Sequence, residues 1–400
     1  MHSPSHSFDV IILGAGAAGL FCAITAGQRG KRVLLLDHAD QAGAKILISG
    51  GGRCNFTNTG VQPERFLSQN RNFARSALVR YTAKDFVALV EKHRIAYHEK
   101  TLGQLFCDGS SRQIVAMLLA EAEAAQVDLR LNHRVTDVSR NDAYVVETDK
   151  GSFTAPALVL ATGGLSIPKM GATGLSHQIA GRFGLAVTET RPGLVPLTFG
   201  ADDLALMQPI SGVSLEVVAK REKRAFREAM LFTHRGLSGP AILQISSYWR
   251  PGEPLSIDLM PDEDAGAWLI ARKRERPKAA VHTILGERLP QRLAVGLVET
   301  MLAPLVPPGA IMHGMSDKAL NKIAMVLKQF TVTPSGTEGY AKAEVTLGGV
   351  DTEALSSRTM ETKEVPGLFV IGEAVDVTGW LGGYNFQWAW SSGWCAGQAI

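Results

Sequence analysis

Two short apolar runs separated by a glycine-rich stretch stand out in the first forty residues. Val10 to Leu13 form a continuous apolar run, which is typical of a parallel strand buried on both faces. A helix is expected at roughly 17–28, ended by Gly30, and the run RVLLLD predicts a second buried strand that finishes in Asp37. The pattern therefore predicts a strand–helix–strand unit.

Later apolar runs continue this pattern. Ala157 to Leu160 predict another strand, which a short Ala-Thr-Gly turn follows. Near the end of the sequence, Leu368 to Ile371 predict a further buried strand, and the glycines at 382–383 open a helix that begins at Tyr384. Strands that alternate with helices are typical of the α/β fold class.

The middle of the chain has a different periodicity, and we expect it to be an insertion. Residues 1–191 and 341–400 are expected to form one domain around it. Residues 192–262 and 326–340 alternate apolar and polar positions in short runs such as GVSLEVVA, which predicts a small β-rich, barrel-like part. Residues 263–325 have helical periodicity with capping residues, which predicts a helical part.

Composition and charge exclude several classes. The 400 residues are 46% hydrophobic and 20% charged, which argues against disorder. The formal net charge of +3 gives no overall basic field of the kind that nucleic-acid-binding proteins carry. The basic runs at 219–228 and 271–278 also contain acids, so a solvated surface is expected there. Contact with RNA or with an acidic partner is the alternative.

The cysteines and the N-terminus bear on the compartment. The four cysteines are scattered, with no Cys-x-x-Cys and no His at zinc spacing, so we expect free thiols and no metal site. The sequence MHSPSHS lacks the positive region of a signal peptide. The apolar stretch at 10–27 is explained by its glycine spacing, so no membrane span is expected. These observations predict a cytoplasmic protein, and nothing in them indicates an obligate protein partner.

The glycine-rich turn points to a dinucleotide. Gly14, Gly16 and Gly19 supply Gly-x-Gly-x-x-Gly, in which the first glycine allows a tight turn, the second lets the backbone approach a pyrophosphate, and the third packs helix against strand. The following helix directs its first amides at that phosphate. Asp37 is placed to bind ribose hydroxyls. FAD and NAD(P) share this pattern, so these residues leave the choice open.

The next segment favours an extended flavin. After Asp37 the chain enters a polar loop, HADQAGAKILISGGGRCNFTN, which carries Lys45 and Arg53 and suits a cofactor wrapped along its pyrophosphate and ribityl chain. Gly163 and Gly164 lack the spacing of a second dinucleotide fingerprint, so no separate nicotinamide domain is expected.

The last part of the sequence supplies further candidate groups. Glu373 and Asp376 follow the predicted closing strand, where they can meet ribityl hydroxyls or the pyrophosphate. The helix that begins with Tyr384, Asn385 and Phe386 offers unsatisfied amides and a positive dipole end. If that end faces the flavin pyrimidine, it stabilises the negative charge that reduction brings.

Several stretches together resemble a known family. They are AKILISGGGRCNFTN, LATGGLSIPKMGATG, LFTHRGLSGPAIL, AEVTLGGV, TMETKEVPGLFVIGEAVDVTG and GGYNFQWAWSSG. They are similar to the BaiN/RdsA-like (YhiN-type) NAD(P)/FAD-dependent oxidoreductases. The sequence departs from that pattern at Phe106 and Cys107, where Phe-Pro is expected.

The resemblance implies a fold, a cofactor and a reaction. The fold is a Rossmann-type FAD-binding domain, a glutathione-reductase-like half, interrupted by the insertion. The reaction is transfer of a hydride from flavin N5 to an electron-poor C=C bond, in a steroid-like acid or in a uridine of ribosomal RNA that becomes dihydrouridine. The substrate is then a small molecule or RNA, and NAD(P)H is the expected transient donor. The residues expected to bind FAD are Gly14, Gly16, Ala17, Ala18, Gly19, Asp37, Lys45, Gly52, Arg53, Asn55, Val135, Thr162, Gly163, Glu373, Asp376, Gly383, Asn385 and Phe386.

Two residues are candidates for proton donation. Cys54 is either a small residue in a loop that holds FAD or a general acid, and a thiol is protonated at neutral pH. The neighbouring Arg53 favours the thiolate, which counts against the acid. His234 is the rival acid. Two other functions stay open: a flavin dehydrogenase or oxidase of a small molecule, and an FAD-binding module in an RNA complex without turnover.

Overall fold

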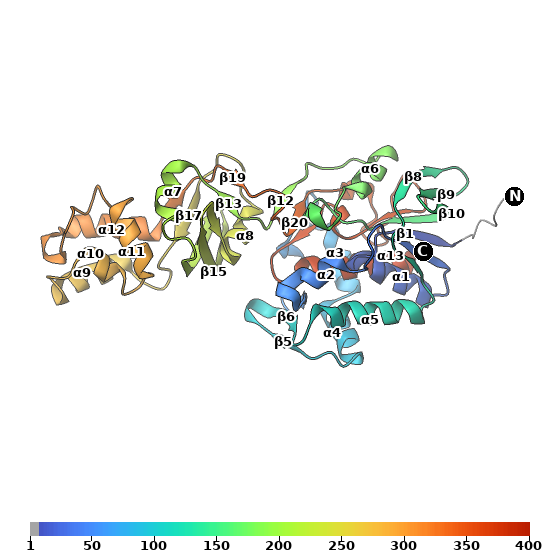
Figure 1. The fold of residues 1–400 in the computed structure, drawn as a ribbon, viewed down its shortest axis with the longest axis horizontal. Coiled ribbons are helices and arrows are strands. Elements are labelled where there is room, and N and C mark those ends of the chain that lie inside the picture. Colours follow the sequence, from blue (N-terminus) through green and yellow to red (C-terminus); the bar gives the residue numbers. More distant parts are fainter. Residues whose placement is uncertain (1–7) are drawn as a thin grey trace. The chain divides into compact units, whose positions relative to one another are not determined.

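The computed structural model describes residues 8–400 and divides into two compact units (Figure 1). The first unit contains the chain up to Arg191 and then Val345–Ile400. The second unit is Pro192–Glu344.

A five-stranded sheet forms the centre of the first unit, in the order β21-β11-β1-β2-β7. Each neighbouring pair is parallel, with Leu13 opposite both Leu160 and Leu36. Because all strands run the same way, their carboxyl ends share one edge, where ligands bind in open α/β sheets. The five strands are β1 (Val10–Leu13), β2 (Val33–Leu36), β7 (Asp128–Arg130), β11 (Ala157–Leu160) and β21 (Leu368–Val370).

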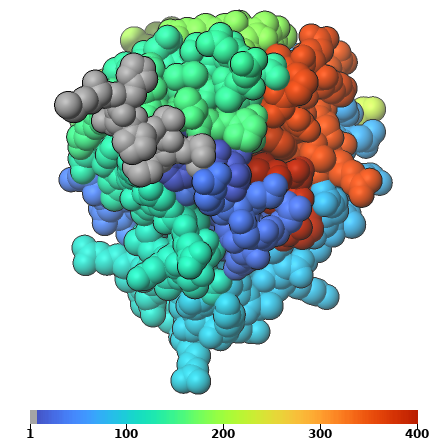
Figure 2. Space-filling model, turned by 90° about the vertical axis from the view of Figure 1, so that its right-hand side faces the viewer, coloured from blue at the N-terminus to red at the C-terminus, as the bar shows by residue number. Residues whose placement is uncertain are grey.

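Two helices far apart in the sequence pack against each other beside this sheet. They are α1 (Ala17–Gln28) and α13 (Tyr384–Ala399). A Cβ added to Gly393 of α13 would lie 2.6 Å from the carbonyl oxygen of Ala18, so only glycine allows this approach. Figure 2 shows atoms of the C-terminal segment, in red, beside blue atoms of the N-terminal segment.

Aromatic side chains fill the space around α13. Trp390 is fully buried, stacks on Phe86 with ring centroids 4.3 Å apart, and donates from Nε1 to the carbonyl of Phe56. Trp388 donates from Nε1 to the carbonyl of Gly372. The tryptophans thus fix α13 against the segments that follow the central strands.

Smaller elements complete the first unit. An antiparallel sheet is formed by β8 (Val135–Arg140), β9 (Tyr144–Thr148) and β10 (Gly151–Ala155), and another by β3 (Asn55–Asn58), β5 (Tyr97–Glu99) and β6 (Gln104–Cys107). The short strands β4 (Phe66–Leu67) and β22 (Thr378–Gly379) pair with each other, and β20 is Val345–Leu347. The helices are α2 (Ala44–Ile48), α3 (Phe73–Arg80), α4 (Ala83–Lys92), α5 (Ser111–Ala124) and α6 (Leu175–Arg182).

The second unit combines an antiparallel sheet with helices. Seven strands pair in the order β18-β17-β14-β15-β16-β13-β19. They are β13 (Leu197–Thr198), β14 (Ser214–Arg221), β15 (Arg224–Thr233), β16 (Gly236–Ser238), β17 (Leu255–Asp258), β18 (Phe330–Val332) and β19 (Gly336–Thr337). The helices are α7 (Ala201–Met207), α8 (Pro240–Ser246), α9 (Ala265–Glu275), α10 (Val281–Leu285), α11 (Gln291–Glu299) and α12 (Asp317–Lys328). In Figure 1, α9 to α12 gather at one end of this unit, beyond its sheet.

Caps begin the two principal helices of this end. The side chain of Asp264 accepts a hydrogen bond from the N–H of Ala267, and Ser316 Oγ accepts one from Ala319, so α9 and α12 each start at a defined residue. Within residues 8–400, no helix has the length and apolar character that crossing a bilayer requires.

Candidate functional site

The glycine turn after β1 has one open side. Gly14 has φ +106°, and a Cβ there would lie 2.5 Å from the carbonyl oxygen of Ala161. A Cβ on Gly19 would lie 1.9 Å from the oxygen of Gly14, so helix and turn touch. At Gly16 an added Cβ would meet no atom within 4 Å in the described chain, adjacent residues aside. Two glycines are thus needed for packing, while the third leaves the backbone open to a ligand at the start of α1.

Asp37 is held beside this turn. Its Oδ2 accepts from the N–H of Ala15 at 2.7 Å and its Oδ1 from the N–H of Ala39 at 2.9 Å. The N–H of His133 donates to the carbonyl of Asp37 at 2.8 Å, which brings the start of β8 at Val135 alongside. The carboxylate therefore has a fixed orientation, suited to ribose hydroxyls.

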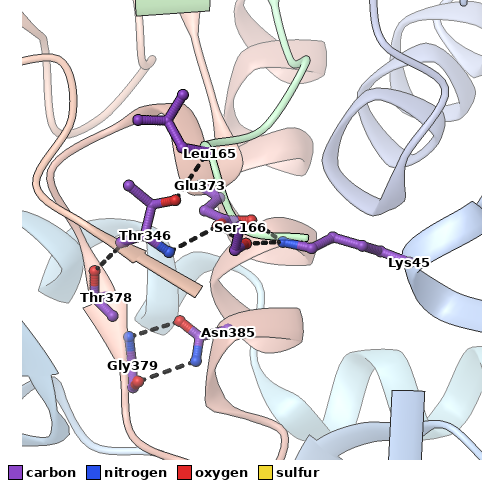
Figure 3. Close-up of polar contacts among 8 residues, drawn as sticks. All are labelled: Lys45, Leu165, Ser166, Thr346, Glu373, Thr378, Gly379 and Asn385. Carbon is purple, nitrogen blue, oxygen red and sulfur yellow. Dashed lines mark hydrogen bonds and ion pairs between the residues drawn. The ribbon is translucent and has the colours of Figure 1, made fainter. Parts of the chain in front are cut away.

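A hydrogen-bonded cluster joins four distant segments of the chain (Figure 3). Lys45 Nζ lies 2.6 Å from both Ser166 Oγ and Glu373 Oε2. The Ser166 hydroxyl and the N–H of Thr346 each donate to Glu373 Oε1 at 2.8 Å. Burial alone would raise the pKa of Glu373, but the Lys45 ammonium and the two other donors hold that pKa below its usual range. Glu373 is therefore an ionised, fully engaged carboxylate that orients Lys45.

Sequence reasoning missed two members of this cluster. Lys45 and Glu373 were predicted as separate cofactor contacts, whereas the structure brings them to each other. Ser166 and Thr346 lie within the stretches LATGGLSIPKMG and AEVTLGGV, which carry the family resemblance. Polar residues inside those stretches were the available signal.

The first turn of α13 lies in close contact with β3. Gly383 has φ +92°, and a Cβ there would lie 2.4 Å from the carbonyl oxygen of Thr57 and 2.8 Å from the side-chain amide of Asn55. Asn385 accepts from the N–H of Gly379 at 2.8 Å and donates to its carbonyl at 3.0 Å (Figure 3). The N-cap Gly383 has no side chain that could cap the helix, and the start of a helix carries the positive end of its dipole.

The loop at 49–54 has an unusual backbone. Gly50, Gly51 and Gly52 have positive φ, and Cys54 also adopts φ +52° although it is not glycine. Space is open around the Cα atoms of Gly51 and Gly52, and Arg53 is exposed. The loop therefore offers backbone and a guanidinium to a ligand.

Cys54 itself is fully buried. Burial raises the pKa of its thiol to about 12, so the thiol is protonated at neutral pH. This position favours a structural role in the loop, and proton donation by Cys54 stays a prediction. The other three cysteines are also buried, and no disulfide joins any of the four.

The remaining predicted cofactor contacts lie in the first unit as well. Ala17 and Ala18 are the first residues of α1. The hydroxyls of Thr162 and Ser176 are 2.7 Å apart, which fixes the turn before Gly163. Asp376 is buried, accepts from the N–H of Gln69 at 3.0 Å, and has a pKa raised by burial. Phe386 stacks on Trp390.

His234 belongs to the second unit. It is exposed in the turn between β15 and β16, and its carbonyl accepts a hydrogen bond from Gln208 Nε2 at 3.2 Å. The other candidate residues all belong to the first unit.

Comparison with known proteins identifies the family. The family described as HI0933-like protein Rossmann domain matches residues 8–399. The chain belongs to this family. It is 51% identical over 395 residues to a ribosomal RNA dihydrouridine synthase of Escherichia coli (strain K12), covering 98% of both chains. It is 45% identical over 396 residues to the protein of the same name from Haemophilus influenzae, again covering 98% of both.

More distant relatives share the fold. A 3-dehydro-bile acid delta(4,6)-reductase of Clostridium scindens is 27% identical over 410 residues, covering 97% of this chain and 98% of the other. The solved structure of the Mycobacterium smegmatis Sdh1 complex in the apo form has a TM-score of 0.50 at 18% identity, covering 98% of this chain and 68% of the other. The second likeness concerns the fold alone.

The predicted family and the predicted Rossmann-type FAD-binding fold are confirmed, and the HI0933-like chain is an FAD-dependent oxidoreductase. The residues present fit that cofactor. The turn is open at Gly16, where a pyrophosphate would approach, and the N-caps of α1 and α13 are the glycines Gly16 and Gly383, which make no side-chain cap hydrogen bond.

Proposed function

We propose that this protein reduces the C5–C6 double bond of a uridine in ribosomal RNA, producing dihydrouridine. The observation that carries the proposal is the 51% identity, over nearly the whole of both chains, to a ribosomal RNA dihydrouridine synthase. The site is consistent with it, because a flavin reductase needs a dinucleotide cradle and a charge-stabilising group near the reacting ring.

The residues of the first unit then have defined tasks. The amides of α1 near Gly16 bind the pyrophosphate, and Asp37 binds the ribose. The pair of Lys45 and Glu373 fixes the central part of the cofactor site. The first turn of α13 at Gly383 faces the pyrimidine end of the ring system.

The reaction needs a hydride and a proton. FAD, when bound and reduced, supplies a hydride from N5 to one carbon of the double bond. A protein acid gives the proton to the neighbouring carbon, so that the π bond is replaced by two C–H bonds and a C–C single bond remains. Cys54 and His234 are the two candidate acids: the thiol of Cys54 is buried in the first unit, and His234 is exposed in the second unit.

The proposed electron donor is NAD(P)H. The chain has one dinucleotide fingerprint, at Gly14, Gly16 and Gly19. A nicotinamide donor therefore binds transiently at the flavin rather than in a domain of its own.

A second candidate is reduction of a conjugated C=C bond in a small molecule. The 27% identity to the bile-acid reductase favours it, and the chemistry at the flavin is the same. The higher identity to the RNA-modifying relatives favours RNA.

One experiment separates these candidates. Purified holoprotein, NADPH or NADH, and ribosomal RNA from cells that lack the enzyme are incubated without oxygen, and nucleosides are analysed by mass spectrometry. Dihydrouridine at a defined position supports the proposal. Reduction of a steroid-like enone with no change in the RNA would overturn it in favour of the small-molecule reductase.

A further inference from the structure

Positive charge is concentrated in one part of the second unit. Residues 265–330, which run from α9 to the first residue of β18, contain ten Lys or Arg against four Asp or Glu. This part therefore carries a formal charge of +6, while the whole chain carries only +3. The remaining residues are net negative, so the excess of cations is local.

Six of these ten cations are engaged within the protein. Lys273 pairs with Asp317 at 2.8 Å, and Lys328 pairs with Asp258 at 2.9 Å. The others hold carboxylates or carbonyls of neighbouring segments: Arg272, Arg276, Arg288 and Arg292. The charges of these six side chains are therefore already used in contacts within the protein.

The other four cations are not engaged by hydrogen bonds or ion pairs within residues 8–400. They are Arg274, Lys278, Lys318 and Lys322, and all four are exposed. The carboxylate of Asp317 interacts with Arg274 at longer range, but this acid does not neutralise four cations, so a bound anion would lower the repulsion among them.

Contacts between segments link the four positions. The pair of Lys273 and Asp317 joins the end of α9 to the start of α12, and Arg274 and Lys318 each follow a member of this pair in the sequence. The N–H of His313 donates to the carbonyl of Pro277 at 2.8 Å, which places Lys278 beside the turn that leads into α12. Lys322 is one turn further along α12. We call these four residues the basic face.

Apolar side chains border the basic face. Ile311, just before the turn that leads into α12, is 40% exposed, and Met325, on the exposed side of α12, is 64% exposed. Exposed cations interleaved with large apolar groups are typical of binding surfaces and unusual on a purely solvated one.

We propose that the basic face binds the phosphate backbone of structured ribosomal RNA and so positions the substrate. The inference rests on the proposed RNA substrate and adds the surface that binds it. Phosphates spaced along RNA match a row of lysines and an arginine that extends over two helices. Ile311 and Met325 then contact ribose and base. An acidic protein surface is the rival occupant, and the test includes it.

The test compares two triple variants of the full-length holoprotein. The first combines Arg274→Gln, Lys318→Gln and Lys322→Gln. The matched control combines Arg112→Gln, Lys84→Gln and Lys150→Gln, which removes the same charge from exposed positions of the first unit. Binding to a ribosomal RNA fragment is measured by fluorescence anisotropy over a range of salt, and dihydrouridine formation is measured on the same RNA and on ribosomal particles.

We expect the basic-face variant to bind RNA about tenfold or more weakly near 0.1 M salt, with the slope of log K against log salt reduced by about 2 to 3. Its KM for RNA rises, while its flavin spectrum and flavin reduction by NAD(P)H stay as in the wild type. The control variant keeps wild-type binding.

Two results would overturn the inference while the proposed function stands. In one, the wild type forms dihydrouridine and both variants bind RNA equally well. In the other, the basic-face variant binds naked RNA normally but loses activity on ribosomal particles, which would assign the surface to a protein. If the wild type forms no dihydrouridine at all, the proposed function fails, and the binding measurement still decides whether the basic face contacts RNA.

Discussion

At the scale of single residues, Cys54 combines two costs that a catalytic thiol would have to overcome. Its φ of +52° lies in the left-handed region, and its side chain is fully buried with a pKa near 12. Because a proton donor has to reach its substrate, these features favour a packing role in the loop at 49–54.

The substitution Cys54→Ala tests that role. Removal of one buried sulfur atom is expected to lower the free energy of unfolding by about 1 to 2 kcal/mol and to leave kcat within about twofold. Denaturant unfolding and steady-state turnover with FAD bound measure the two effects. His234→Ala is the comparison: a fall of kcat by about 100-fold with the flavin spectrum unchanged would assign the acid to this histidine. A loss of turnover in Cys54→Ala at normal FAD content would instead make the thiol the acid.

The pair of Lys45 and Glu373 gives a prediction with a pH dependence. The folded-state pKa of Glu373 lies below its ordinary value, so the pair contributes its full stability above about pH 4.3, the ordinary pKa of a glutamate. This contribution is lost as the pH falls through the lower folded value.

Lys45→Met should therefore destabilise the protein by about 2 kcal/mol at pH 7, a value reduced from that of a deeply buried pair because Lys45 is partly exposed. The difference from the wild type should shrink as the pH falls below the ordinary pKa of a glutamate and through the lower folded value. Urea unfolding at pH 7 and at pH 3.5 to 4.5 measures it, and Glu373→Gln is the matched variant. An equal difference at all pH values would mean that the ion pair contributes nothing and that only packing was lost.

At the scale of elements, the turn between β1 and α1 separates glycines that pack from the glycine that faces a ligand. Gly19 touches the backbone of Gly14, whereas Gly16, with φ −82°, has open space where its Cβ would be.

Gly16→Ala is accordingly expected to fold with the stability of the wild-type apoprotein but to bind FAD at least about tenfold more weakly, because the methyl group occupies the space of the pyrophosphate. Gly19→Ala should lower the free energy of unfolding by about 3 kcal/mol even without FAD, because helix and turn have to separate. Thermal unfolding of both apoproteins and FAD titration of the refolded forms distinguish the two effects. If Gly16→Ala retained FAD as the wild type does, the proposed cradle would be misplaced.

The same turn indicates what sequence alone can predict. The strand–helix–strand unit follows from local pattern, because continuous apolar runs and glycine spacing act within about thirty residues. The pairing of Lys45 with Glu373 does not, since 328 positions separate them. The seven-stranded sheet is similar: β13 pairs with β19 through Leu197 and Thr337, and no local signal specifies that partner. In the candidate cofactor site, the spacing of the glycines and of Asp37 along the sequence was enough to predict them. Ser166 and Thr346 meet Lys45 and Glu373 only in the folded chain, so no local pattern predicts them.

At the scale of the whole molecule, the proposed function requires one dinucleotide-binding unit for two reactions. In the first the donor reduces the flavin, and in the second the flavin reduces the substrate. The chain carries a single Gly-x-Gly-x-x-Gly, and the second unit contains an antiparallel sheet with helices rather than a second parallel sheet. The hydride donor and the substrate therefore need the same flavin in succession.

This organisation predicts ping-pong kinetics, in which the donor reduces the bound flavin and leaves before RNA takes its place. Double-reciprocal plots at several RNA concentrations should therefore be parallel. Excess donor should inhibit competitively with RNA. In an anaerobic stopped-flow experiment without RNA, NADPH or NADH should bleach the flavin at a rate at least equal to kcat. The basic-face triple variant is a useful control, since its bleaching rate should equal that of the wild type while its reoxidation by RNA slows. Bleaching that occurs only when RNA is present, with intersecting double-reciprocal lines, would require donor and substrate to bind together, and the donor would then need a site outside the single fingerprint.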